Sequence, residues 1–187
     1  MVPGDPGNLK VTVPDDLVRA AAWLVAGRTS RTGIGHDSHP FGPGEPLSLG
    51  GVEIADAPRL HGHSDGDVAL HAVADALLGG AELGDLGRHF PADVGTPRGA
   101  PSSDLVVDVR RRVEEAGWWP ASVDLTIVAA RPRLEPHLDR MREAIATLLG
   151  LDPAAVNVKA SSGNLDGADG AGRSISALAI ATLERLP

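Results

Sequence analysis

Residues 62–78, which read GHSDGDVALHAVADALL, limit the possible folds of this chain more than any other stretch. Their valines and leucines recur at helical spacing, so we expect most of the stretch to form one helix against an apolar core. Ser64 or Asp65 is the expected N-cap, because a short side-chain oxygen accepts hydrogen bonds from the free amides of a first helical turn. Two carboxylates and one histidine then share one helix face at intervals of four: Asp67, His71 and Asp75. Such a face beside a glycine-rich entry indicates the wall of a polar site.

The other periodic segments alternate between strands and helices. A hairpin is expected over residues 47–54, because Gly50 and Gly51 supply the positive φ that such a turn needs. The remaining expected elements are strands over 31–41, 123–128, 156–160 and 175–183, helices over 102–116 and 136–149, and loops over 79–98 and 164–172. This alternation predicts a single α/β (α+β) domain in which helices cover one face of a mixed sheet.

Composition narrows the function classes. The chain of 187 residues has only 3% aromatic residues, so its core is expected to be aliphatic. It has no cysteine, which excludes a disulfide framework and a thiolate metal site. The net charge of −8 argues against nucleic acid as a partner. No apolar run approaches membrane-spanning length and no apolar signal core opens the chain, so a cytoplasmic protein without a membrane partner is expected.

A candidate metal site combines a strand with the helix. Asp37 and His39 are two residues apart, so on an extended segment they point to the same side and can converge on one ion. His71 can supply a third ligand, and two histidines with one carboxylate leave the open position typical of catalytic zinc. From spacing alone, an ordinary surface role for such a pair is the more frequent outcome. Asp75 is expected to orient His71 or a neighbouring group, and Asp67 is equally compatible with helix capping.

Three motifs in a fixed order carry a family resemblance. RTGIGHDSHPF, HSDGDVALHAVADALLGGAELGDLGRHFP and RPRLEPH resemble the 2-C-methyl-D-erythritol 2,4-cyclodiphosphate synthases, over residues 31–185 or so. That family consists of zinc-dependent cyclases of the non-mevalonate isoprenoid pathway. The resemblance implies conversion of 4-diphosphocytidyl-2-C-methyl-D-erythritol 2-phosphate to the cyclic diphosphate with release of CMP. It also implies a homotrimer whose sheets face the threefold axis, with each active site between neighbouring subunits.

The resemblance assigns roles to individual positions. Asp37, His39 and His71 fall where the family holds zinc, and a second divalent ion, usually magnesium, bridges the diphosphate. His63 falls at a position that stabilises the transition state, and Ser162 matches a threonine that polarises a phosphate. The substrate-binding positions that the resemblance implies are Asp37, His39, His63, Ser64, Asp85, Leu86, Gly87, Phe90, Asp93, Ala129, Arg131, Pro132, Arg133, Leu134, Glu135, Ser161, Ser162 and Asn164.

The late glycine-rich segment departs from the family pattern. Asn164 replaces a glutamate that binds the second metal, and a neutral amide oxygen is a poorer magnesium ligand than a carboxylate. Asp166 and Asp169 are the available substitutes. Ala168 and Ala171 replace a phenylalanine and an arginine at the trimer axis, which implies a wider and less basic central cavity. Two alternatives therefore stay open: a catalytically impaired zinc-binding paralogue that binds cytidine nucleotides or isoprenoid phosphates, and a metal-dependent phosphoesterase acting on another cytidine diphosphate compound.

Residues 1–30 form an N-terminal extension that differs from the domain at 31–187. A strand over 9–13 and a helix from Pro14 through Leu24 are expected there. The run GNLKVTVPDDL resembles the C-terminal end of the 2-C-methyl-D-erythritol 4-phosphate cytidylyltransferases, which in some organisms are fused to the cyclase. We therefore expect the cyclase part of a fused cytidylyltransferase–cyclase, with an unrelated β-α segment as the alternative.

Overall fold

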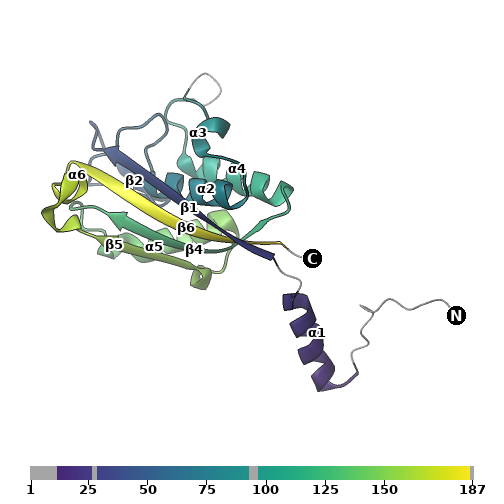
Figure 1. Ribbon diagram of the computed structural model, residues 1–187. Helices are drawn as coiled ribbons and strands as arrows, with labels where there is room; N and C mark the ends of the chain where they lie inside the picture. The colour runs from purple at the N-terminus through teal and green to yellow at the C-terminus, as the bar shows by residue number, and fades with distance from the viewer. Residues whose placement is uncertain (1–11, 27–28, 93–96, 186–187) are drawn as a thin grey trace.

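The computed structural model describes residues 12–26, 29–92 and 97–185. Within these ranges the chain folds into a four-stranded sheet, a small hairpin and a layer of helices against one sheet face, as Figure 1 shows. This confirms the predicted single α/β domain with a mixed sheet. No helix in the described part of the chain combines the length and the apolar character needed to cross a membrane.

The sheet has the strand order β1-β6-β4-β5. Its strands are β1 (Thr29–Pro40), β4 (Trp119–Val128), β5 (Val156–Ser161) and β6 (Ser174–Arg185). β6 runs antiparallel to both β1 and β4, and β4 runs parallel to β5, which makes the sheet mixed. All four strands were predicted, but their bounds differ: β4 begins four residues before its predicted start at 123, and the other three differ by one or two residues at their ends. The separate hairpin joins β2 (Leu47–Leu49) to β3 (Val52–Ile54) around the two predicted turn glycines.

Three long helices lie on the same face of the sheet: α2 (Val68–Gly80), α4 (Ser102–Glu115) and α5 (Leu138–Leu149). Shorter helical segments are α3 (Leu86–His89), η1 (Glu135–His137), η2 (Pro153–Ala155), η3 (Gly163–Leu165) and α6 (Gly167–Gly170). Hence the segments 79–98 and 164–172, expected to be loops, each contain short helical turns. The buried core is aliphatic as predicted, because leucine, valine, isoleucine and alanine make up nearly all of it.

The helix α2 lies directly against β1, and two glycines make this possible. A Cβ atom at Gly35 would stand 2.0 Å from the carbonyl oxygen of Ala72, and one at Gly33 would stand 1.9 Å from that of Ala76. Any side chain at either position would therefore push the helix away from the strand. The close approach holds His71 of α2 beside the polar end of β1.

The N-cap of α2 is Asp67, so the prediction of Ser64 or Asp65 was wrong. The helix begins at Val68 because Gly66 has a φ of 85°, which interrupts helical geometry just before it. The Asp67 side chain accepts hydrogen bonds from the amides of Ala69 at 3.1 Å and Leu70 at 3.0 Å. The capping interpretation of Asp67 is thus confirmed.

The N-terminal extension contains α1 (Pro14–Ala26), which confirms the predicted helix. Figure 1 shows α1 standing apart from the sheet and its helices. The strand expected over 9–13 falls mostly outside the described residues, and residues 12–13 adopt no strand.

Candidate functional site

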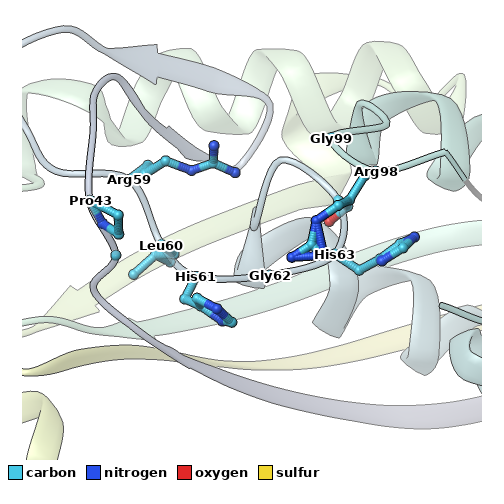
Figure 2. A pocket seen from close by; sticks show the side chains of 10 residues that line it. Pro43, Arg59, Leu60, His61, Gly62, His63, Arg98 and Gly99 are labelled. Carbon is cyan, nitrogen blue, oxygen red and sulfur yellow. The ribbon is translucent and has the colours of Figure 1, made fainter.

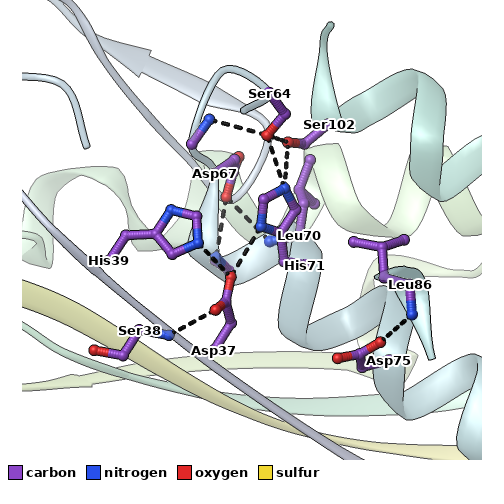
Figure 3. A network of polar contacts seen from close by, with 12 residues as sticks. Asp37, Ser38, His39, Ser64, Asp67, Leu70, His71, Asp75, Leu86 and Ser102 are labelled. Carbon is purple, nitrogen blue, oxygen red and sulfur yellow. Dashed lines mark hydrogen bonds and ion pairs between the residues drawn. The ribbon is translucent and has the colours of Figure 1, made fainter. Parts of the chain in front are cut away.

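The three predicted metal ligands converge at the end of β1. Asp37 and His39 lie on the same side of that strand, and His71 reaches them from α2 (Figure 3). The Oδ2 atom of Asp37 is 3.0 Å from Nε2 of His39 and 2.9 Å from Nδ1 of His71. Among the described residues this is the one group of three or more histidine and acidic side chains whose donor atoms all lie within 4.8 Å of one another. The triad can therefore hold a metal ion.

The three triad side chains shift the pKa values of Asp37 and His71 toward their charged forms. Burial raises the pKa of Asp37, but the hydrogen bonds and charges of His39 and His71 outweigh it and leave that pKa well below its ordinary value. Burial lowers the pKa of His71, but the Asp37 carboxylate outweighs it and leaves the pKa raised. Both shifts favour positive charge beside the Asp37 carboxylate.

Asp75 hydrogen-bonds to a neighbouring backbone group, the second of the two roles expected for it. Its Oδ1 atom accepts the amide of Leu86 at 2.7 Å, so it ties the start of α3 to α2. Asp85 caps α3 by accepting the amide of Arg88 at 3.1 Å, and its carboxylate also pairs with the Arg88 guanidinium. Burial raises the pKa of Asp75, and the Leu86 amide partly offsets this. The predicted segment Asp85–Leu86–Gly87 is therefore anchored to the helix that carries His71.

A pocket of about 350 Å³ opens beside the triad (Figure 2). His63 and Ser64, both predicted substrate-binding residues, line it, and so do Arg59 and Arg98, which the sequence analysis did not single out. Ser64 joins the pocket to the triad, because its Oγ lies 2.9 Å from Nε2 of His71. The amide of Gly99 donates to the carbonyl of His63 at 2.7 Å, which brings the Arg98 segment to the pocket. The lining is positively charged and suits an anion.

Two segments of predicted substrate-binding residues, 129–135 and 161–164, meet at the ends of the parallel strands β4 and β5. The amide of Ala129 donates to the carbonyl of Ser161 at 2.9 Å, so the loop after β4 and the turn after β5 are neighbours. Arg131 donates from Nε to the carbonyl of Gly172 at 3.0 Å and places its guanidinium 4.7 Å from the centre of the Phe41 ring. The remaining predicted residues of these two segments are Pro132, Arg133, Leu134, Glu135, Ser162 and Asn164, of which Leu134 alone is buried.

Within one chain this second cluster is separate from the triad. β6 and β4 lie between β1 and β5, so three strand spacings of about 4.8 Å place the two clusters about 14 Å apart across the sheet. The register nonetheless puts them at the same end of the sheet, because His39 pairs with Ile175 while Val128 pairs with both Ser176 and Ser161.

The remaining predicted residues lie in the two segments that were expected to be loops, 79–98 and 164–172. Phe90 ends α3 and carries the guanidinium of Arg112 at 5.5 Å from its ring centre, whereas Asp93 lies outside the described residues. Asn164 adopts a left-handed conformation with φ of 49°. Asp169 accepts the hydroxyl of Ser176 at 2.6 Å and that of Ser174, so its carboxylate serves the structure of that segment.

Sequence reasoning also missed Ser102, the first residue of α4. It is completely buried, and its Oγ lies 3.0 Å from Nε2 of His71. No pattern linked it to the site, since 31 positions separate it from His71.

Comparison with known proteins agrees with this geometry. The YgbB family matches residues 30–184. A bifunctional enzyme IspD/IspF from Anaeromyxobacter dehalogenans is 46% identical over 185 residues, covering 99% of this chain and 47% of that protein. A 2-C-methyl-D-erythritol 2,4-cyclodiphosphate synthase from Chromobacterium violaceum is 49% identical over 153 residues, covering 82% of this chain and 97% of that protein.

A solved structure of IspF from Plasmodium falciparum in complex with CDP superposes with a TM-score of 0.73 at 26% identity, covering 84% of this chain and 97% of that one. The chain spans about half the length of the bifunctional relatives it matches. The family match covers the whole sheet and helix layer, including the strand and helix that carry Asp37, His39 and His71. The chain belongs to the YgbB family.

Proposed function

We propose that this chain is a 2-C-methyl-D-erythritol 2,4-cyclodiphosphate synthase. The observation that carries the proposal is the convergence of Asp37, His39 and His71 beside a cationic pocket in a chain 49% identical to a synthase of that name. In the proposed reaction an oxygen of the substrate's 2-phosphate attacks the β-phosphorus of the cytidine diphosphate group. The bond from that phosphorus to the CMP oxygen breaks, the ring closes and CMP leaves. No protein nucleophile is needed.

Zinc fits the donor set of the triad. Two imidazole nitrogens and one carboxylate oxygen are the ligand types that catalytic zinc takes, and the distances of 2.9 and 3.0 Å around Asp37 bring all three donors to one small volume. Asp37, His39 and His71 would hold the ion. Bound there, zinc supplies Lewis acidity toward a phosphoryl oxygen.

The chain's own residues address the repulsion between the two phosphates. Arg59 and Arg98 provide fixed positive charge in the pocket, and His63 and Ser64 add hydrogen-bonding groups beside the triad. Both reacting phosphates are anions, so most of the activation barrier comes from their mutual repulsion and from the need to align them. Positively charged and hydrogen-bonding side chains lower that barrier by stabilising the charge and by positioning the phosphates. We also propose that the Ser162 hydroxyl, which lies in the cluster at the end of β5, polarises a phosphate oxygen of the same substrate.

A homotrimer accounts for two features that a single subunit leaves unexplained. The sheet face opposite the helices exposes large apolar side chains: Ile34 (66%), Leu178 (40%) and Ile180 (41%). The triad and the Ser162 cluster lie on opposite edges of that sheet. Three sheets facing a threefold axis would cover the apolar face and set one subunit's triad beside its neighbour's Ser162 cluster.

A second divalent ion, magnesium, is part of the proposal and would bridge the diphosphate. Asn164 stands near the turn after β5 and offers an amide oxygen, and Asp169 is already committed to two serine hydroxyls. The substrate's own phosphate oxygens and water would then complete the coordination, as is usual for magnesium. The same asparagine favours the alternative of a zinc-binding paralogue that binds cytidine nucleotides without turning over.

We also propose that residues 1–30 derive from the end of a cytidylyltransferase. The bifunctional relative aligns with 185 residues of this chain and the single-function synthase with 153, so the extension has its counterpart in the fused protein. The test compares cytidylyl transfer by this chain with that by a form that includes a complete cytidylyltransferase domain before residue 1. Only the longer form is expected to transfer the cytidylyl group.

The proposal is tested by incubating the purified chain with the cytidylated 2-phosphate substrate, zinc and magnesium. Release of CMP and appearance of a cyclic diphosphate in ³¹P NMR spectra are expected, and His71→Ala should abolish both. CDP binding without any CMP release would select the paralogue instead, and release of inorganic phosphate or another monoester would select a phosphoesterase.

A further inference from the structure

On the side away from Asp37, the His71 ring contacts a series of hydrogen-bonded side chains that have no part in the proposed reaction. While Nδ1 of His71 faces Asp37, Nε2 lies 3.0 Å from the Oγ atom of Ser102 (Figure 3). Ser102 in turn donates its hydroxyl to Oδ1 of Asp65, and its backbone amide donates to Oδ2 of the same carboxylate at 3.0 Å. Asp65 is itself anchored, since its Oδ1 also accepts the amide of Asp67 at 3.1 Å.

The direction of the hydrogen bonds follows from counting protons. The Ser102 hydroxyl has one proton and three neighbouring acceptors: Oδ1 of Asp65, Oγ of Ser64 at 3.3 Å and Nε2 of His71. The carboxylate is the charged acceptor and the closest, so it takes the proton. The Ser102 oxygen then has only lone pairs to offer His71, and Nε2 must carry a hydrogen to complete the contact. Nδ1, which is hydrogen-bonded to Asp37, is then the ring nitrogen whose lone pair would bind a metal ion when the ion displaces that hydrogen.

We propose that Ser102 and Asp65 are positioning residues that fix the ring orientation and tautomer of His71 for metal binding. Asp65 acts through Ser102, and Ser102 acts through His71. This inference rests on the proposed metal-dependent function. Ligating histidines commonly donate their second ring N–H to an oxygen that orients them, and losing such a partner typically costs 10- to 100-fold in metal affinity. Here two buried serine oxygens share that place: Ser64 Oγ at 2.9 Å and Ser102 Oγ at 3.0 Å from Nε2 of His71. Of the two, Ser102 is the one held by Asp65, and it makes α4 part of the site.

A purely structural role for the same residues is the competing explanation. Asp65 also accepts the Ser102 amide and so holds the first turn of α4. Ser102→Ala separates the two roles, because it removes the hydroxyl and leaves the backbone amide on Asp65. Ser103→Ala is the matched control, since it deletes a hydroxyl from the next residue of the same helical turn. Ser102→Thr restores the hydroxyl.

The experiment titrates the metal-free full-length variants with Zn²⁺ in competition with a chromophoric chelator. Ser102→Ala and Asp65→Asn are each expected to weaken zinc binding 10- to 100-fold, Ser103→Ala to leave it unchanged, and Ser102→Thr to recover most of it. The Asp65→Asn/Ser102→Ala double variant should be no weaker than the single ones, because the two residues act in series.

A second readout is ¹⁵N NMR of the histidine rings. In the zinc-loaded chain the His71 signals should show a metal-bound Nδ1 and a protonated Nε2, and Ser102→Ala should disturb that pattern. Unchanged zinc affinity and an unchanged His71 pattern in Ser102→Ala would overturn the inference. Zinc binding that depends on Ser102 in a chain that releases no CMP would instead sustain the inference and reject the proposed activity. Failure of the unaltered chain to bind zinc would reject both.

Discussion

Neighbouring aspartates have different roles because their oxygens meet different partners. Asp67 is 1% exposed, and its two oxygens accept the amides of Ala69, Leu70, Gly50 and Gly51, at distances of 2.7 to 3.1 Å. It therefore joins α2 to the β2–β3 turn, and both of its oxygens are occupied by backbone amides. Asp37 instead turns one oxygen toward two imidazoles, which is the geometry of a ligand.

Replacing Asp67 with asparagine should destabilise the chain by about 2–4 kcal/mol. An amide cannot accept with both ends, so at least one of the four backbone N–H groups loses its partner in a buried place. The free energy of unfolding from urea titrations would measure the loss. Asp139→Asn is the control, because its carboxylate is exposed and its ion pair with Arg142 contributes little. Equal stability of the two variants would contradict the role given to Asp67.

The triad predicts a pH dependence of the metal-free chain. The lowered pKa of Asp37 gives stability that is present above its ordinary value of 3.8 and is lost as pH falls through the folded value. The raised pKa of His71 gives stability that is complete below 6.5 and is lost as pH rises through the folded value. The stabilising effect of the pair should therefore decline from mildly acidic to alkaline pH, while zinc affinity rises as the competing proton leaves. Urea unfolding of the unaltered chain and His71→Ala from pH 5 to 9 would measure it, and a difference that grows with pH would refute it.

At the scale of elements, the site depends on how closely α2 approaches β1. Gly33 and Gly35 bring the helix backbone onto the strand, and this contact sets His71 beside Asp37. The hairpin and α4 then fix the helix from its other end, through Asp67 and Ser102. The ligand positions are thus determined by backbone packing as much as by the ligands themselves.

Gly35→Ala should both unfold the chain more easily and weaken zinc binding. The added methyl would overlap the Ala72 carbonyl and force α2 outward, at a cost of about 1–3 kcal/mol or more. Denaturation and chelator competition would report the two effects. Gly79→Ala is the matched control, because its Cβ would meet nothing closer than 3.8 Å and alanine favours a helix. If Gly35→Ala behaves as Gly79→Ala does, the packing argument fails.

At the scale of the whole molecule, the proposed trimer depends on the exposed apolar face of the sheet. Ile34, Leu178 and Ile180 are exposed on β1 and β6. In the described part of the chain, α2, α4 and α5 cover the other face of the sheet (Figure 1). The triad lies on one sheet edge and the Ser162 cluster on the other. A trimer would join the two clusters across a subunit boundary.

Ile180→Glu should convert the proposed trimer to monomers that still bind zinc but form no cyclic product. A buried carboxylate at each of three symmetry-related positions would repel its copies. Sedimentation velocity and the CMP assay would measure mass and activity together. Leu17→Glu on α1, at a position 61% exposed and remote from the sheet face, should change neither. A monomeric unaltered chain with full activity would refute the trimeric site.

The sequence by itself determined the four sheet strands, the three long helices against them and the three candidate ligands. These depend on local periodicity and on motif residues that keep their chemistry wherever they lie, whereas the short helices within 79–98 and 164–172 were expected to be loops. Tertiary structure decided which aspartate caps α2, that Asp75 holds Leu86, and that Arg59, Arg98 and Ser102 belong beside the site. Those roles depend on contacts between residues far apart in the chain, such as Ser102 with His71. A contact of that kind has no periodic signature, since it exists only once the backbone has folded and the partners have met.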